Sequence, residues 1–99
     1  MTAERDSSIE DVLARLRLSA RGWIVVDHWD GDRCAVGVAA ENRPRQLVYI
    51  STFNRKANRY YFECEAPTGD NPTDFKTTDE GEVDFTALVA VMEKHLGSK

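Results

Sequence analysis

The stretch QLVYISTFNRKANRYYFECEA, residues 46–66, decides the fold of this 99-residue chain. Two runs that are rich in β-branched and aromatic residues flank a polar centre, which is typical of two strands joined by a hairpin loop. We therefore expect strands over 46–53 and 59–66, with the loop at 54–58. Strands that are joined by so short a loop must pair antiparallel.

Side chains of the second of these strands alternate between its two faces. Phe62 and Cys64 share an apolar face, whereas Glu63 and Glu65 point to the wetter one. A nucleophilic cysteine needs a lowered pKa, and the two adjacent carboxylates act in the opposite direction. We therefore expect Cys64 to be a buried structural thiol, and we expect Cys34 and Cys64 to be free and reduced.

A helix precedes the sheet. Ser7 or Ser8 can cap it, because Glu10 follows Ser7 by three residues as in a capping box. Gly22 is suited to end this helix as the residue after its last turn. The apolar face repeats at helical spacing and consists of Ile9, Val12, Leu13, Leu16 and Ala20.

Two further strands, at about 22–29 and 33–40, flank Asp30 and Gly31, a pair that is a strong hairpin-turn signal. The polar segment 41–45 then connects to the strand that begins at residue 46. Within this segment Pro44 removes a backbone donor, so we expect it to break strand pairing.

The downstream part of the chain ends in the best-signalled helix. Asp84 is its expected N-cap, Val83 and Leu88 stand at the positions of a hydrophobic staple, and Gly97 ends it. A short fifth strand is expected at 74–78, at an edge of the sheet. The helix carries an apolar stripe of Phe85, Leu88, Val89, Met92 and Leu96.

The order of these elements predicts an α+β fold: an antiparallel four- to five-stranded sheet with N- and C-terminal helices packed on one face as a two-layer sandwich. Residues 8–97 form a single domain in this interpretation, and residues 1–7 are disordered or frayed. The chain has neither a secretory signal nor an apolar run of the roughly 20 residues that span a bilayer, so we expect a cytoplasmic protein without a membrane partner.

Charge is segregated along the chain. Residues 43–62 carry five basic side chains and no acid, whereas residues 63–84 carry eight acids and one lysine, and the net charge is −4. An acidic patch attracts basic partners and repels nucleic acid. Arg55, Lys56 and Arg59 lie among aromatic residues, as in a single-strand binder, but loop tips are also commonly charged. We interpret these three residues as a solvated hairpin tip and expect no nucleic-acid partner.

Metal and cofactor motifs are weak. Asp27, His28, Asp30 and Asp32 are close together but lack the order of a calcium loop, and the DGD turn is the simpler interpretation. Cys34, Cys64, His28 and His95 lack the usual zinc spacings. The sequence contains no Gly-rich phosphate loop and no nucleophile elbow. We therefore predict no metal, no cofactor and no catalytic residue.

Several segments together resemble the small immunity proteins of bacterial polymorphic toxin systems, especially those of contact-dependent growth inhibition. They are an N-terminal amphipathic helix, GWIVVDHWDGD (22–32), QLVYISTF (46–53), RYYFECE (59–65) and DFTALVAVMEKHL (84–96). The resemblance implies a non-catalytic cytoplasmic protein that binds a cognate toxin domain, often a basic nuclease, and occludes its active site. Such families diversify their binding surfaces, so no contact residue is carried over by position.

An acidic surface is the expected site of contact with this basic partner. The acidic cluster before the last helix has two interpretations of equal standing: its charges compensate the helix dipole, or they contact the partner. The cluster consists of Asp79, Glu80, Glu82 and Asp84. A dimeric secretion chaperone or adaptor is the alternative function, whereas we expect a free immunity protein to be a monomer. A small enzyme that uses Cys64 or His28 is the third hypothesis. The candidate contact residues are Asp30, Asp32, Asp70, Asp74, Asp79, Glu80 and Glu82.

Overall fold

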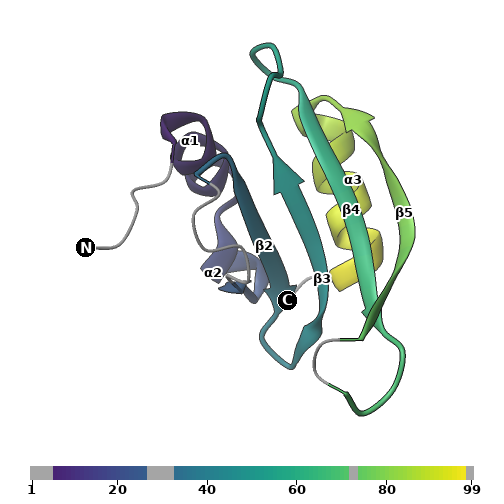
Figure 1. Cartoon of the computed structure of the whole chain (residues 1–99). Coiled ribbons are helices and arrows are strands. Elements are labelled where there is room, and N and C mark those ends of the chain that lie inside the picture. Colours follow the sequence, from purple (N-terminus) through teal and green to yellow (C-terminus); the bar gives the residue numbers. More distant parts are fainter. Residues whose placement is uncertain (1–5, 27–32, 72–73, 98–99) are drawn as a thin grey trace.

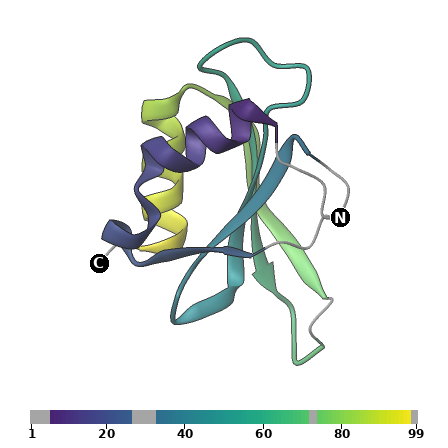
Figure 2. The ribbon, with the colours of Figure 1, turned by 90° about the vertical axis from the view of Figure 1, so that its left-hand side faces the viewer.

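A computed structural model describes residues 6–26, 33–71 and 74–97 of the chain. Five antiparallel strands pair in the order in which they occur in the sequence, and the helices cover one face of the sheet (Figures 1 and 2). This confirms the predicted two-layer α+β fold. The strands are β1 Trp23–Val26, β2 Ala35–Ala40, β3 Arg43–Ser51, β4 Tyr60–Pro67 and β5 Phe75–Val83. The helices are α1 Ser7–Leu16, α2 Leu18–Arg21 and α3 Phe85–Leu96.

The hydrophobic core lies between the helices and the sheet. Alternate side chains of β4 enter it, and Cys64 is only 2% exposed, as the alternation predicted. Each fully buried aliphatic side chain in such a core contributes about 1.5–3 kcal/mol to stability. The buried side chains that α1 and α3 supply are Ile9, Val12, Leu16, Leu88, Met92 and Leu96.

The N-terminal helix differs from the prediction at its start and in its middle. Asp6 is its N-cap and accepts a hydrogen bond from the backbone of Ser8, so the capping assignment to Ser7 or Ser8 was wrong by one or two residues. Arg17 has φ 52° and divides the expected helix into α1 and the four-residue α2. Gly22 ends α2 with φ 76°, as predicted.

Strand β1 begins at Trp23, one residue after the expected start, and β2 begins at Ala35 and not at 33. The expected continuation of β1 over 27–29 lies outside the described residues. The described pairing of the two strands runs from Trp23 opposite Ala40 to Val26 opposite Gly37. The turn predicted at Asp30 and Gly31 lies outside the described residues.

Strand β3 begins at Arg43, three residues before the expected start at 46, and Pro44 lies within it. Strand pairing is nevertheless interrupted at Pro44, as predicted, since Arg43 pairs with Ala40 and the next pair is Leu47 with Ala39. The register between β2 and β3 shifts between Ala39 and Ala40. Proline is tolerated near the start of a strand and at bulges, because no ladder hydrogen bond is needed from its nitrogen there.

Strand β5 is much longer than the expected 74–78 and pairs with β4 from Pro67 opposite Phe75 to Tyr60 opposite Val83. Helix α3 agrees with the prediction at both ends, since Asp84 caps the Ala87 N–H at 2.9 Å and Gly97 is the C-cap. The sheet also satisfies the last carbonyl groups of α3, which lack partners within the helix. Trp23, Arg43 and Gln46 donate hydrogen bonds to the carbonyl oxygens of Gly97, Leu96 and His95, respectively.

Candidate functional site

The sheet face opposite the helices presents a group of tyrosine and glutamate side chains over β3, β4 and β5. No helix among the described residues covers this face (Figure 2). The register places Tyr49 opposite Glu63, which in turn lies opposite Glu80. We call this group the Tyr/Glu face; it comprises Tyr49, Tyr61, Glu63, Glu65, Glu80 and Glu82.

Tyr61 is the centre of the Tyr/Glu face. Its hydroxyl oxygen lies 2.6 Å from Oε1 of Glu63 and 2.9 Å from Oε2 of Glu80. The hydrogen bond to Glu63, partial desolvation and the bond to Glu80 raise the pKa of Tyr61, so the phenol stays protonated as a donor. A phenol has one proton, so Tyr61 donates to two carboxylates in alternation or through a shared bond.

Aromatic and apolar groups adjoin these carboxylates. The rings of Tyr49 and Tyr61 are in an edge-to-face arrangement with centroids 6.5 Å apart, a favourable geometry for an aromatic pair. Towards β1 the same sheet face continues in half-buried Ile24 and Val26. Leu47 also lies on this face, but at 1% exposed it is not accessible to a partner. The face therefore combines fixed negative charge with an apolar flank.

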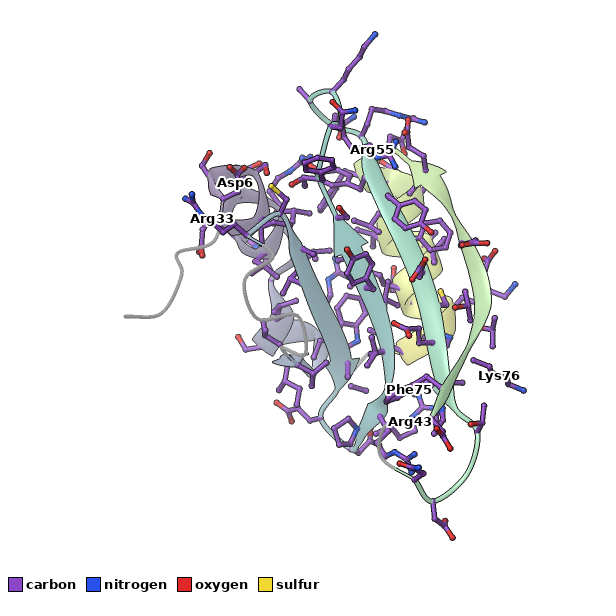
Figure 3. All side chains as sticks on the ribbon, viewed as in Figure 1. Asp6, Arg33, Arg43, Arg55, Phe75 and Lys76 are labelled. Atoms are coloured by element: carbon purple, nitrogen blue, oxygen red, sulfur yellow. The ribbon has the colours of Figure 1, made fainter. Side chains whose placement is uncertain are left out.

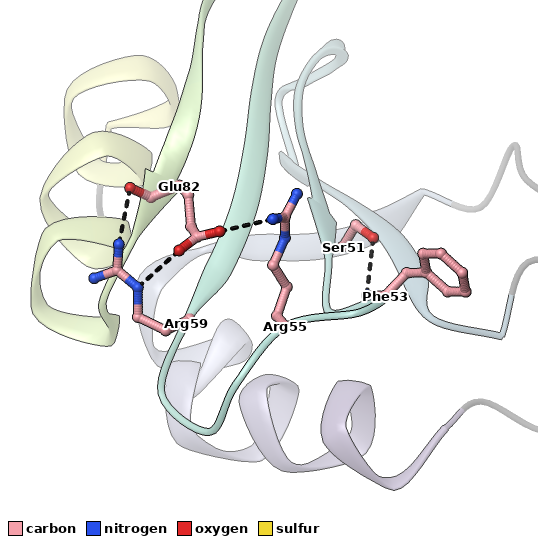
Figure 4. Close-up of polar contacts among 5 residues, drawn as sticks. All are labelled: Ser51, Phe53, Arg55, Arg59 and Glu82. Carbon is pink, nitrogen blue, oxygen red and sulfur yellow. Dashed lines mark hydrogen bonds and ion pairs between the residues drawn. The ribbon is translucent and has the colours of Figure 1, made fainter.

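Glu82 is neutralised by the hairpin between β3 and β4. Nη1 of Arg55 lies 2.7 Å from Oε1 of Glu82, and Nε of Arg59 lies 3.0 Å from Oε2 (Figure 4). The hydrogen bond from Arg59 and the charge of Arg55 hold the pKa of Glu82 below its usual value. Two of the three basic residues of the predicted tip thus bind within the protein, whereas Phe53 at the tip is 70% exposed.

The predicted contact residues are divided by the fold. Glu80 and Glu82 lie on the Tyr/Glu face, but Asp79 pairs with Cys64 and points to the helix side of the sheet. Asp70 and Asp74 are exposed in the connection between β4 and β5. Asp30 and Asp32 lie outside the described residues.

Sequence reasoning did not include Glu63 and Glu65 among the acidic candidate contacts. The signal for them was present, because alternation had already placed both glutamates on the wetter face of β4. They were missed because the acidic residues were grouped by their position in the chain rather than by the face of the sheet they share.

The connection between β4 and β5 is held against β3. Nη2 of Arg45 lies 2.8 Å from the carbonyl oxygen of Gly69 and 2.7 Å from that of Asn71. This arginine fixes the loop that carries Asp70, at the end of the sheet opposite the hairpin tip (Figure 3).

A hollow of about 540 Å³ lies on the helix side, between β5 and α3. Cys64 lines it, but burial and the nearby carboxylate of Asp79 raise the pKa of this thiol to about 11, although Lys94 acts in the opposite direction. The thiolate is the reactive form, so this environment disfavours nucleophilic chemistry at neutral pH. The lining residues are Cys64, Thr78, Asp79, Ala90, Val91, Lys94 and His95.

In the part of the chain that the structure describes, no three His, Cys, Asp or Glu side chains are grouped so that they can hold a metal ion. None of the described helices combines the length and the apolar character needed to cross a bilayer. Comparisons with protein-family models, with curated proteins and with solved structures found no match to this chain.

Proposed function

We propose that this protein acts without catalysis, as a cytoplasmic immunity protein whose Tyr/Glu face binds and blocks a basic toxin domain. The observation that carries the proposal is the pair of glutamates, Glu63 and Glu80, held by Tyr61 on a sheet face that no described helix covers. Fixed carboxylates beside aromatic rings are suited to a partner that is cationic and has a flat or concave apolar border.

Electrostatic complementarity supports a nuclease as the partner. A nuclease needs a positive cleft to hold phosphate, and an acidic surface is attracted to such a cleft from a distance. Glu63, Glu65 and Glu80 supply this charge, whereas Glu82 contributes less because Arg55 and Arg59 neutralise it.

Aromatic anchors support slow release once the complex has formed. Tyrosine is enriched among the residues that dominate binding energy in protein interfaces. Tyr49 and Tyr61 are half-buried and constrained by each other and by the glutamates, so they lose little conformational entropy on binding.

An exposed apolar stripe on a helix, together with a dimeric mass, would favour the alternative of a dimeric secretion chaperone. Leu88, Met92 and Leu96 instead face the protein's own core and are at most 2% exposed. This burial favours the immunity hypothesis over the chaperone hypothesis.

The test begins with affinity capture from the native host and identification of any stoichiometric partner by mass spectrometry. The partner is then expressed alone and together with this protein. We expect growth arrest by the partner alone, rescue by co-expression, and a complex that weakens as salt rises.

Charge reversal tests the surface itself. The double variant Glu63→Lys/Glu80→Lys should lose rescue, whereas Glu10→Lys/Asp11→Lys on the exposed side of α1 should keep it. Both variants must remain folded by circular dichroism. Full rescue by a folded Glu63→Lys/Glu80→Lys protein would exclude the Tyr/Glu face as the binding surface.

A further inference from the structure

The outer edge of β5 is a second candidate binding surface, next to the Tyr/Glu face. β5 is the last strand of the sheet, and its only strand partner among the described residues is β4. Lys76 to Glu80 are all exposed, and Lys76 lies at the outer side of the strand (Figure 3). A strand at the end of a sheet offers backbone N–H and C=O groups to a further strand.

The hollow between β5 and α3 runs beside this edge. Thr78 and Asp79 form its strand side, and Ala90, Val91 and Lys94 form its helix side. A groove between an edge strand and a helix is suited to an added strand, because the strand pairs by its backbone while alternate side chains enter the groove.

The charge of β5 opposes pairing with a second copy of the chain. Asp79 and Glu80 are adjacent and exposed, and the strand also contains the register shift beside Cys64 and Glu65. Like charges and bulges are means by which edge strands avoid self-association. A segment that carries basic residues meets attraction instead of repulsion at the same edge.

We propose that an extended basic segment of the partner adds to β5 as a sixth strand of the sheet and places alternate side chains in the hollow. This inference rests on the proposed function for the basic character of the partner. It uses the outer edge of β5 and the hollow, and of the Tyr/Glu face it involves only Glu80. The hollow has a mixed lining, in which Ala90 and Val91 offer apolar contacts beside Asp79 and Lys94. We therefore place small apolar side chains of the added strand against Ala90 and Val91. Side chains on the opposite face of the added strand lie nearest to Glu80 and are therefore cationic.

A synthetic peptide tests the inference without the natural partner. The probe is a nine-residue peptide of alternating lysine and valine, blocked at both ends. We expect binding by calorimetry, together with at least tenfold slower hydrogen exchange at alternate backbone amides of β5.

N-methylation of the peptide separates strand addition from simple charge attraction. One analogue is methylated at the lysine nitrogens and the other at the valine nitrogens, and both keep every charge. In an added strand only one set of N–H groups points to β5. We therefore expect one analogue to bind at least tenfold more weakly and the other to bind as the parent peptide does. Equal binding of both analogues would overturn the inference.

The variant Ala90→Trp tests the hollow, since Ala90 is exposed and a large side chain there fills the groove without entering the core. The matched control is Ala14→Trp, at an exposed position of α1. We expect at least tenfold weaker peptide binding for Ala90→Trp and no change for the control, and unchanged binding by Ala90→Trp would count against the groove.

Two further results would overturn strand addition. One is a protein that is dimeric in sedimentation with its β5 amides already protected, because a second copy would then occupy the edge. The other is peptide binding that perturbs Tyr61 and Glu63 but not the β5 amides. The latter result would leave the proposed function of the Tyr/Glu face intact. Conversely, failure of the native protein to rescue growth would contradict the proposed function but not strand addition at β5.

Discussion

Glu63 and Glu80 lie directly opposite each other on β4 and β5. Like charges in this relationship destabilise an antiparallel pair, so the sheet needs a compensating group at this position. The hydroxyl of Tyr61 is that group, since it lies within hydrogen-bonding distance of both carboxylates. The stability of this part of the sheet and the order of the proposed binding surface therefore depend on the same phenol.

Tyr61→Phe should lower the free energy of unfolding by about 1–2 kcal/mol at pH 7, because it removes the donor and leaves the two carboxylates facing each other. Urea denaturation measures this change. The same substitution in a Glu80→Gln protein should cost less, since the charge repulsion is then absent. Equal losses in the two backgrounds would show that Tyr61 does not compensate the glutamate pair.

The raised pKa of Tyr61 predicts a loss of stability in alkali. Below pH 10 the phenol is protonated in both the folded and the unfolded chain, so its contribution is fully present. Above about pH 10 the unfolded chain releases the proton and the folded chain retains it, so stability falls as pH rises. Unfolding measured from pH 8 to pH 11 should show a steeper decline for the natural protein than for Tyr61→Phe, and parallel curves would contradict the assignment.

The elements that local sequence signals specify were predicted well. Asp84 and Gly97 mark both ends of α3, and the alternation from Tyr60 to Glu65 gives the two faces of β4. In each case the local preference and the tertiary structure agree, so the pattern was sufficient.

The elements that tertiary contacts specify were predicted poorly. The run Asp79 to Glu82 has low strand propensity, but in β5 the donor of Tyr61 and the guanidinium groups of Arg55 and Arg59 compensate its charge. Arg17 breaks the first helix without a glycine or proline to indicate it. The same underestimate of β5 separated Glu80 from Glu63 in the predicted site, because their proximity exists only once the two strands pair.

The N-cap residue of α3, Asp84, contributes to the free energy of unfolding. Asp84→Ala should destabilise the protein by about 1 kcal/mol, because the side chain accepts the Ala87 N–H at 2.9 Å, whereas the nearby side chain of Asn58 accepts the Phe85 N–H. Thermal unfolding measures the loss. Asp11→Ala, at an exposed position within α1, is the matched control and should change stability by less than about 0.5 kcal/mol.

The reactivity of the Cys64 thiol shows whether this residue is structural or a nucleophile. Burial and Asp79 raise its pKa to about 11, so the fraction present as thiolate at neutral pH is very small. In a Cys34→Ser protein at pH 7.5, iodoacetamide should modify Cys64 only as fast as the protein opens, and promptly after addition of urea. Rapid modification of the folded protein would instead support the hypothesis of a small enzyme that uses this thiol.

Glu82 forms ion pairs with Arg55 and Arg59 and thereby holds the β3–β4 hairpin, which carries the exposed Phe53. Glu82→Gln removes the charge that Arg55 and Arg59 share, so the loop from residue 52 to residue 59 should become more mobile while the sheet remains folded. Backbone ¹⁵N relaxation should show lower order at Phe53, whereas Glu10→Gln on α1 should leave the loop unchanged. In the natural protein the lowered pKa of Glu82 keeps its carboxylate charged below the usual pKa of a glutamate, so the loop should stay ordered under mild acid and loosen only as pH falls through the folded-state value. A loop that is equally ordered in Glu82→Gln would show that its backbone turns, and not the two arginines, fix the position of Phe53.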